Sequence, residues 1–443
     1  MFSNKDLRKL IIPLVIEQLL AVTIGMADTV MVSSCGEAAV SGISLVDSIN
    51  FLLITLFSSL ATGGAVIASQ YIGRGDHKSA SLAAKQLFYA SLALSAVLGI
   101  IAVFFRKPVL NMVFGSIEAD VMAHAQIYFL LSAISYPFLA VYNAGAALFR
   151  SMGDSRTTML ISILMNTINI VGNAILIYGF HMAAAGASTA SLVSCAVGAI
   201  IITVLLLNPH RIIFYDKLHK PEIHLSMLKS ILQIGVPNGL ENSIFQIGKI
   251  LVASIVSGFG TISITANAVA GNLASLQVIP GMALGMAMIT VVGQCIGAKD
   301  YEAVKKYTKK LMLITYGVVW AMTLLMLLFS KQILSFYSLS EETTTMTMEV
   351  FIVHGICAVI VWPLAFALPN ALRAANDVRF TMIVSLLSMW IFRIGFSYIL
   401  AIYFNMGILG TWIAMCIDWF CRGACFVIRF ARGKWKNISF IDN

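Results

Sequence analysis

Long apolar runs recur along the whole sequence, each close to the roughly 20 residues that a helix needs to cross a bilayer. Polar or glycine-containing breaks separate these runs. The pattern predicts an all-α membrane protein with twelve transmembrane helices. The expected spans cover residues 10–33, 43–69, 87–105, 126–149, 159–180, 186–207, 231–257, 262–292, 311–329, 350–372, 381–403 and 407–430.

The composition agrees with a chain that lies in lipid. Of its 443 residues, 59% are hydrophobic and only 11% are charged, whereas a soluble domain has about 25% charged residues. The first apolar run resembles a signal peptide, but it continues without a small-residue cleavage site, so we expect a retained first helix. Seven cysteines lie without paired spacing, which indicates neither a disulfide framework nor a zinc site.

The net charge of +9 could indicate a nucleic-acid partner, but the positions of the charges argue for a membrane. Most of the 29 basic residues fall in the termini and in every second predicted loop, which is the positive-inside pattern. The pattern predicts that both termini are cytoplasmic and that the basic surface faces anionic membrane lipids and no nucleic acid. The exceptions are Arg106, Lys107 and Lys331 in the alternate loops and Lys249 and Arg393 inside the spans.

An internal repeat organises the chain. A shift of 224 residues superimposes Pro13 on Pro237, Glu17 on Glu241, Gly36 on Gly260, Gln70 on Gln294, Gly73 on Gly297 and Asp76 on Asp300. A shift of 223 pairs Arg150, Asp154, Thr158 and Met159 with Arg373, Asp377, Thr381 and Met382. We therefore predict two pseudo-symmetric six-helix bundles, residues 1–210 and 229–443, joined by a cytoplasmic linker at 211–228. Transporters built from such repeats bind substrate between their halves.

Carboxylates inside the membrane are the first candidate site residues, because each costs roughly 2.5–3.5 kcal/mol there and should face protein or water. The chain has five of them: Glu17, Asp28, Asp47, Glu241 and Asp418. A buried carboxylate can exchange a proton for Na⁺ or an organic cation, although a hydrogen-bonded helix contact is the alternative for each. Asp47 is expected near the outer surface. Asp418 and Arg393 fall at similar depths, which favours a structural ion pair.

Two further polar features fall within the predicted spans. Asn166, Asn169 and Asn173 form one polar stripe on an otherwise apolar helix, suited either to interhelical hydrogen bonds or to contact with a cation or substrate. Lys249 could supply a fixed positive charge or could extend its side chain to the membrane surface.

Several segments together resemble the multidrug and toxin extrusion (MATE) family over nearly the full length. In the first half they are PLVIEQLLAVTIGMADTVMV, ASQYIGRGD, LFRSMGDSRTTM and NTINIVGN, and in the second half GQCIGAKD and LRAANDVRFTM. The resemblance implies two six-helix bundles arranged as a V around a central cavity. It also implies drug export driven by inward flow of H⁺ or Na⁺, in a protein of the bacterial cytoplasmic (inner) membrane that we expect to be a monomer.

The resemblance also suggests roles for individual residues. Asp28 matches the helix 1 acid of the family, and Pro13 matches a proline at which helix 1 bends. In the DinF-like branch that acid works with partners that correspond here to Tyr128, Asn169, Asn173 and Ser191. We expect Glu17 to take part in coupling as well, with Na⁺ as a possible ligand of Asp28. The expected substrate cavity includes Glu241, Lys249, Asn166 and Asp47.

The chain departs from both branches of the family. Asn173 stands where the DinF-like pattern has an acid, so one negative charge is missing. In the NorM-like branch a helix 7 glutamate lies at the position of Phe245, whereas Glu241 is one turn earlier. Helix 10 has no acid between Glu349 and Asp377.

These observations predict a secondary active antiporter that exports small cationic or lipophilic drugs in exchange for H⁺ or Na⁺, without another cofactor. A flippase for a lipid-linked sugar or other lipid precursor is an alternative, and its anionic cargo would need basic groups such as Lys249 and Arg393. A passive channel is also compatible with the repeat. A membrane enzyme is not indicated, because the sequence shows no paired His/Asp motif, phosphate loop or metal cluster.

Overall fold

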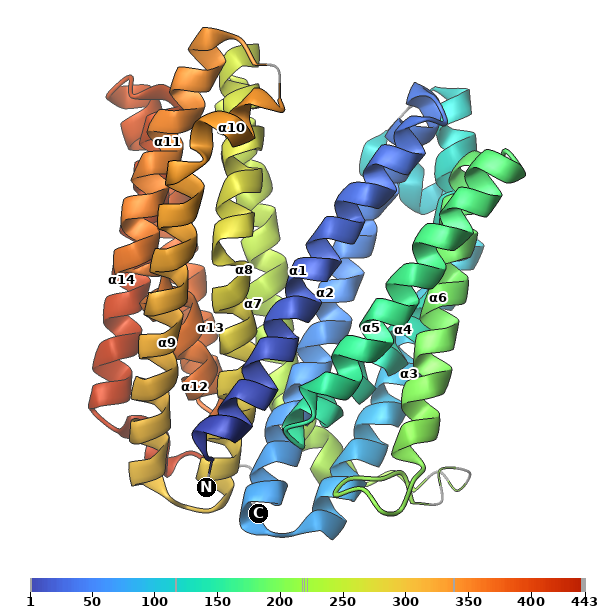
Figure 1. Cartoon of the computed structure of the whole chain (residues 1–443), viewed down its shortest axis with the longest axis vertical. Helices are drawn as coiled ribbons and strands as arrows, with labels where there is room; N and C mark the ends of the chain where they lie inside the picture. Colours follow the sequence, from blue (N-terminus) through green and yellow to red (C-terminus); the bar gives the residue numbers. More distant parts are fainter. Residues whose placement is uncertain are drawn as a thin grey trace. The chain divides into compact units, whose positions relative to one another are not determined.

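The computed structural model is helical throughout the membrane-spanning part of the chain (Figure 1). It describes residues 2–115, 118–216, 218, 220, 222–337 and 339–439, except for the side chains of residues 24, 26, 27 and 29. The chain forms two compact units, Phe2–Gly239 and Leu240–Asn443. The predicted linker at 211–228 includes residues 217, 219 and 221, which lie outside the described part, and the predicted domain limits stay a prediction.

Within its described residues, the first unit contains six long helices and the start of a seventh. They are α1 (Asn4–Ser33), α2 (Glu37–Arg74), α3 (His77–Phe114), α4 (Ala119–Ser151), α5 (Ser155–Asn173) with its π-helical extension η1 (Ala174–Gly179), α6 (Ala183–Leu206) and α7 (Leu225–Ser257).

The second unit contains the remainder of α7 and the helices that follow it. They are α8 (Thr261–Gly297), α9 (Tyr301–Leu328), α10 (Ser330–Ser335), α11 (Glu341–Ile360), η2 (Pro363–Ala367), α12 (Leu368–Ala374), α13 (Val378–Ser388), η3 (Met389–Gly395), η4 (Tyr398–Tyr403), α14 (Gly407–Ala431) and η5 (Lys434–Asn437).

Eleven helical segments of the described chain are long and apolar enough to cross a membrane, and each contains or overlaps one predicted span. The remaining predicted span, 10–33, falls in α1, which is 30 residues long and continues through Pro13. The chain is therefore a multi-span, all-helical membrane protein, as the hydrophobic pattern predicts. A role for Pro13 as a hinge stays a prediction.

The backbone conformation also follows the internal repeat. Residues with positive φ, which mark the ends of helices and tight connections, recur in pairs 223 or 224 positions apart. The π-helices η1 and η4 are related by the same spacing of 224. The positive-φ pairs are Gly36 and Gly260, Gly75 and Lys299, Gly153 and Asn376, His181 and Asn405, and Ala183 and Gly407.

Small residues allow α4 to pack closely in the first unit. A Cβ atom at Gly42 of α2 would lie 2.8 Å from the carbonyl oxygen of Val121, and one at Gly99 of α3 would lie 2.9 Å from that of Ala133. Close backbone approach is how helices associate in lipid, where no hydrophobic effect drives them together. These contacts fix the part of α4 that carries Tyr128.

Candidate functional site

Asp28 of α1 lies in a cluster of neutral polar side chains from α5 and α6. Asn173 Nδ2 donates to the Asp28 carboxylate at 2.7 Å. The amide orientation of Asn169 is assigned from its neighbours. In that orientation its Nδ2 donates to the two Asp28 oxygens, at 2.8 and 3.1 Å, and its Oδ1 accepts from Ser191 at 2.9 Å. We call Asp28, Asn169, Asn173 and Ser191 the Asp28 cluster.

The Asp28 carboxylate has no cationic partner within the described part of the chain. Among the residues that the structure describes, no lysine, arginine or histidine forms an ion pair with it, and the side chain is half-buried. Asn169 and Asn173 are 6% and 1% exposed, and the buried Oδ1 of Asn173 has no hydrogen-bond partner among the described residues. The cluster therefore combines one formal negative charge with a free amide oxygen, both of which can bind a cation.

Local geometry explains how the sequence builds this cluster. Asn169 and Asn173 are four residues apart, so both amides lie on one face of α5. Apolar residues from α1, α2, η1 and α6 also pack together, one to two turns along the chain from the cluster residues of α1, α5 and α6. They are Val32, Ile43, Ile177, Ala184 and Ala187.

Asp47 of α2 forms a second polar cluster with α4. The Tyr128 hydroxyl donates to Asp47 Oδ1 at 2.9 Å, and Asn50 Nδ2 donates to the same oxygen at 3.4 Å. The Tyr136 hydroxyl donates to Asn50 Oδ1 at 2.7 Å, and Asn50 Nδ2 also donates to Ser132 at 3.3 Å. We call these five residues the Asp47 cluster.

Tyr128 thus bonds to Asp47, although the family resemblance associates it with Asp28. The sequence pattern did not lead us to Asn50, Ser132 and Tyr136 as candidate site residues. The available signal was the recurrence of Tyr128, Ser132 and Tyr136 at every fourth position of α4.

The two intramembrane glutamates each pair with an arginine. Arg150 Nη1 lies 3.2 Å from Glu17 Oε1, and Thr158 Oγ1 donates to Glu17 Oε2 at 2.9 Å. A coupling role for Glu17 stays a prediction, but its charge is already balanced within the described residues.

The second unit repeats this arrangement. Arg373 Nη2 lies 2.7 Å from Glu241 Oε1, and the Ser385 hydroxyl donates to the same oxygen at 2.6 Å. Glu17 and Glu241 are 224 residues apart and Arg150 and Arg373 are 223 apart, so the two ion pairs occupy equivalent places in the repeat. A place for Glu241 in the substrate cavity stays a prediction.

The remaining candidates make contacts with other groups. Asn166 donates to Ser162 on its own helix at 3.3 Å. Lys249 belongs to the other unit, where its Nζ lies 5.2 Å from the centre of the Phe245 ring. Their predicted places in a substrate cavity stay predictions.

Asp418 pairs most closely with Arg422, which lies within the predicted span 407–430 but was counted with the C-terminal basic residues. Arg422 Nη2 lies 3.2 Å from Asp418 Oδ1, whereas the predicted partner Arg393 lies 4.0 Å from Oδ2. The predicted ion pair is present but is the longer of the two. Arg422 follows Asp418 by four residues on α14, a spacing that brings side chains together on a helix.

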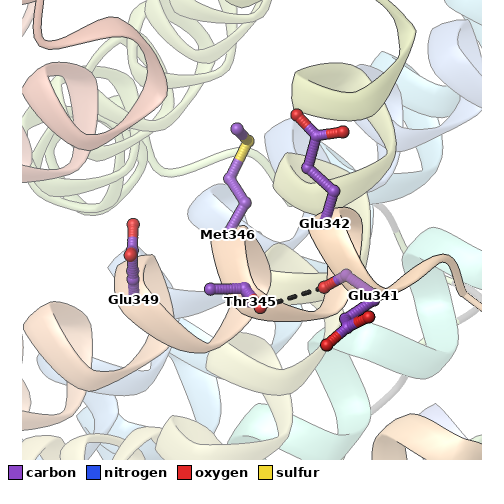
Figure 2. A pocket seen from close by; sticks show the side chains of 5 residues that line it. All are labelled: Glu341, Glu342, Thr345, Met346 and Glu349. Atoms are coloured by element: carbon purple, nitrogen blue, oxygen red, sulfur yellow. Dashed lines mark hydrogen bonds between the residues drawn. The ribbon is translucent and has the colours of Figure 1, made fainter.

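A pocket of ≈ 520 Å³ lies against the first turns of α11 (Figure 2). Glu341, Glu342 and Glu349 line it together with Thr345 and Met346. Glu341 and Glu342 fall in the first turn of α11, where negative charge stabilises the helix dipole. The pocket contains none of the predicted site residues.

Comparison with known proteins identifies the family. The MatE family model matches residues 13–175 and again residues 237–399, the two halves of the repeat. The chain belongs to the MATE family of multidrug efflux transporters. It is therefore a transporter and not an enzyme, and the resemblance of its motifs is confirmed.

Individual relatives of this MATE protein match over nearly its whole length. It is 27% identical to the uncharacterized transporter YisQ of Bacillus subtilis, over 96% of the chain and 93% of the relative. It is 25% identical to a probable multidrug resistance protein NorM of Thermotoga maritima, over 98% of the chain and 93% of that relative. An outward-facing structure of a multidrug resistance MATE family transporter of the MOP superfamily superposes with a TM-score of 0.89. The two sequences are 20% identical, and the superposition covers 98% of this chain and 97% of the other. The all-helical MATE fold is confirmed.

Proposed function

We propose that this MATE protein is a secondary antiporter that exports cationic or lipophilic drugs in exchange for H⁺ or Na⁺. The observation that carries the proposal is the half-buried Asp28 carboxylate, which accepts hydrogen bonds from two neutral amides and has no cationic partner among the described residues. An ionised carboxylate that is partly withdrawn from water is stabilised when a cation neutralises it.

A proton, Na⁺ and the ammonium group of a drug can each neutralise Asp28, but only one can do so at a time. A proton would bind a carboxylate oxygen directly. Na⁺ would bind the carboxylate and an amide oxygen such as Asn173 Oδ1, because oxygen ligands suit hard cations. Binding of the coupling ion therefore displaces the drug, and this competition links their movements.

The single charge of the Asp28 cluster has consequences for energetics. Exchange of one H⁺ or Na⁺ for one monovalent drug moves no net charge, so only concentration gradients drive it. Exchange for a neutral drug moves one charge, and a potential of 100 mV then contributes about 2.3 kcal/mol. That energy corresponds to a drug gradient of roughly 50-fold.

Transport by purified protein in proteoliposomes, with a pH gradient and a Na⁺ gradient imposed separately, tests this function. We expect one gradient to drive uphill movement of ethidium against its own concentration. Movement only down the ethidium gradient would identify a passive channel, and movement of neither kind would reject a drug substrate of this class. We further propose a bacterial cytoplasmic membrane location with both termini cytoplasmic, and a monomeric transporter.

A lipid flippase is the second candidate function. Lys249 and Arg393 are two of three cations grouped around one aromatic ring in the second unit, and such a group suits an anionic headgroup. Translocation of a fluorescent phospholipid in the same proteoliposomes, without movement of ethidium, would favour this function over drug export.

A further inference from the structure

Three helical segments of the unit Leu240–Asn443 place cations around the ring of Phe245. Lys249 Nζ of α7 lies 5.2 Å from the ring centre, Arg393 Cζ of η3 lies 5.5 Å away, and Arg422 Cζ of α14 lies 5.4 Å away. Arg422 also lies 5.3 Å from the ring of Phe366. We call Lys249, Arg393 and Arg422 the basic cluster.

The basic cluster is not neutralised within the described part of the chain. Asp418 is the carboxylate bonded to it, and this side chain is satisfied by two oxygen contacts from Arg422 and a short hydrogen bond from Ser388. The nearby Glu241 is paired with Arg373, so that pair adds no net charge. Three positive groups and one negative group leave two positive charges inside the membrane-spanning region, where uncompensated charge is costly.

Among the three cations of the basic cluster, Arg393 has the largest number of N–H donors without a hydrogen-bond partner in the described ranges. A guanidinium carries five N–H donors, yet the Arg393 side chain makes no hydrogen bond to any residue of the described ranges, and its distance to Asp418 is 4.0 Å. Its Nε atom is fully buried, as is that of Arg422. Arg393 lies in the π-helical segment η3, and such segments often occur at functional sites.

Lys249 does not extend toward the nearer end of α7. It lies eight residues before the end of α7 at Ser257, so an extended side chain could approach that end. Its ammonium group instead lies over Phe245, one turn toward the middle of the helix. The side chain is nevertheless exposed, so a ligand can reach it.

We infer that the basic cluster binds an amphiphile with a phosphate or carboxylate headgroup. Guanidinium groups bind such anions through paired N–H donors, and the unused donors of Arg393 are suited to this contact. Lys249 adds a second positive charge, and the rings of Phe245 and Phe366 provide apolar surface for the adjoining part of the ligand. The site lies outside the Asp28 cluster and does not depend on cation exchange.

Binding of ³²P-labelled lauroyl glycerol 3-phosphate to the purified full-length protein tests this site. We expect Arg393→Gln and Lys249→Gln each to weaken binding about tenfold or more. Lys331→Gln serves as the matched control, because it removes an exposed charge of the same unit that lies outside the basic cluster. Thermal unfolding in detergent checks that each variant is folded. If Arg393→Gln does not fold, Lys249→Gln still tests the site, because Lys249 is exposed and its side chain makes no ion pair with a described residue.

Competition distinguishes the source of the anion. Unlabelled glycerol 3-phosphate that competes as well as the lauroyl compound indicates a free phosphate ester, whereas competition by the lauroyl compound alone indicates a lipid headgroup. Equal binding by all three variants, or competition by neutral monolauroyl glycerol as strong as that by the phosphate, would overturn the inference. The readout uses neither a drug nor an ion gradient, so its failure leaves the proposed antiport untouched.

Discussion

Asn173 Nδ2 donates a 2.7 Å hydrogen bond to the Asp28 carboxylate, and this amide occupies the place of an acid in one branch of the family. The Asp28 cluster consequently has one formal charge, which sets the proposed exchange at one ion per cycle.

Asn173→Asp is expected to add a second carboxylate to the Asp28 cluster. Two coupling ions would then move for each monovalent drug, and net charge would cross the membrane in each cycle. Ethidium transport should become sensitive to a K⁺–valinomycin potential, whereas wild-type transport should be insensitive to it. Asn111→Asp, which adds a carboxylate at an exposed position of α3 outside the cluster, is the control. Equal voltage dependence in wild type and Asn173→Asp would contradict the one-charge account.

Glu17→Gln is expected to destabilise the protein by on the order of 3 kcal/mol, because it leaves the charge of Arg150 without this partner in a mostly buried position. Thermal unfolding in detergent should show a lower midpoint. Glu241→Gln should have a similar effect through Arg373, because the two pairs are equivalent in the repeat. If Glu17→Gln and Arg150→Gln had strictly additive effects in the double variant, the two side chains would not be coupled and the prediction would be wrong.

Tyr128→Phe is expected to act through Asp47 and not through Asp28. The substitution removes the 2.9 Å hydrogen bond to Asp47, a loss of about 1 kcal/mol or roughly fivefold in a transport constant. Its effect should largely vanish in an Asp47→Asn background, where that charge-assisted bond is already gone. A double-mutant cycle on the apparent ethidium affinity measures this, and an effect that persists unchanged in Asp47→Asn would show that Tyr128 acts elsewhere.

Asp76→Ala is expected to lower stability by about 1 kcal/mol, because Asp76 caps α3 by accepting from the backbone N–H of Ser79 at 3.0 Å. Hydrogen bonds from Ser79 hold the pKa of Asp76 below its ordinary value of 3.8. The stabilisation is therefore fully present above pH 3.8 and is lost as the pH falls through the lower pKa of the folded protein. Unfolding midpoints of wild type and Asp76→Ala should converge in strong acid; a constant difference would contradict the cap.

The sequence was sufficient to predict the spans and the repeat, because both depend on local and periodic features. Hydrophobic length defines each helix, and a shift of 223 or 224 residues superimposes the halves whatever their packing. Asn169 and Asn173 were also predictable as neighbours of Asp28, since their spacing defines one face of α5 and the family motif links that face to helix 1.

Side-chain partners across helices were less predictable. Nothing local in the sequence joins Glu17 to Arg150, which is 133 residues away, and only the packing of α1, α4 and α5 brings them together. Tyr128 bonds to Asp47 because α2 and α4 pack closely at Gly42, a contact that no spacing reveals. Arg422 lies within the predicted span 407–430, four residues after Asp418, so this pairing could have been identified from the sequence.

The most direct test of the account compares ion-driven ethidium transport by wild type and Asp28→Asn in proteoliposomes. Asp120→Asn, which removes an exposed carboxylate from the first turn of α4, is the matched control, and thermal unfolding checks that each variant is folded. We expect Asp28→Asn to abolish transport driven by either a pH or a Na⁺ gradient, and Asp120→Asn to transport like wild type. Undiminished gradient-driven transport by a folded Asp28→Asn variant would contradict it.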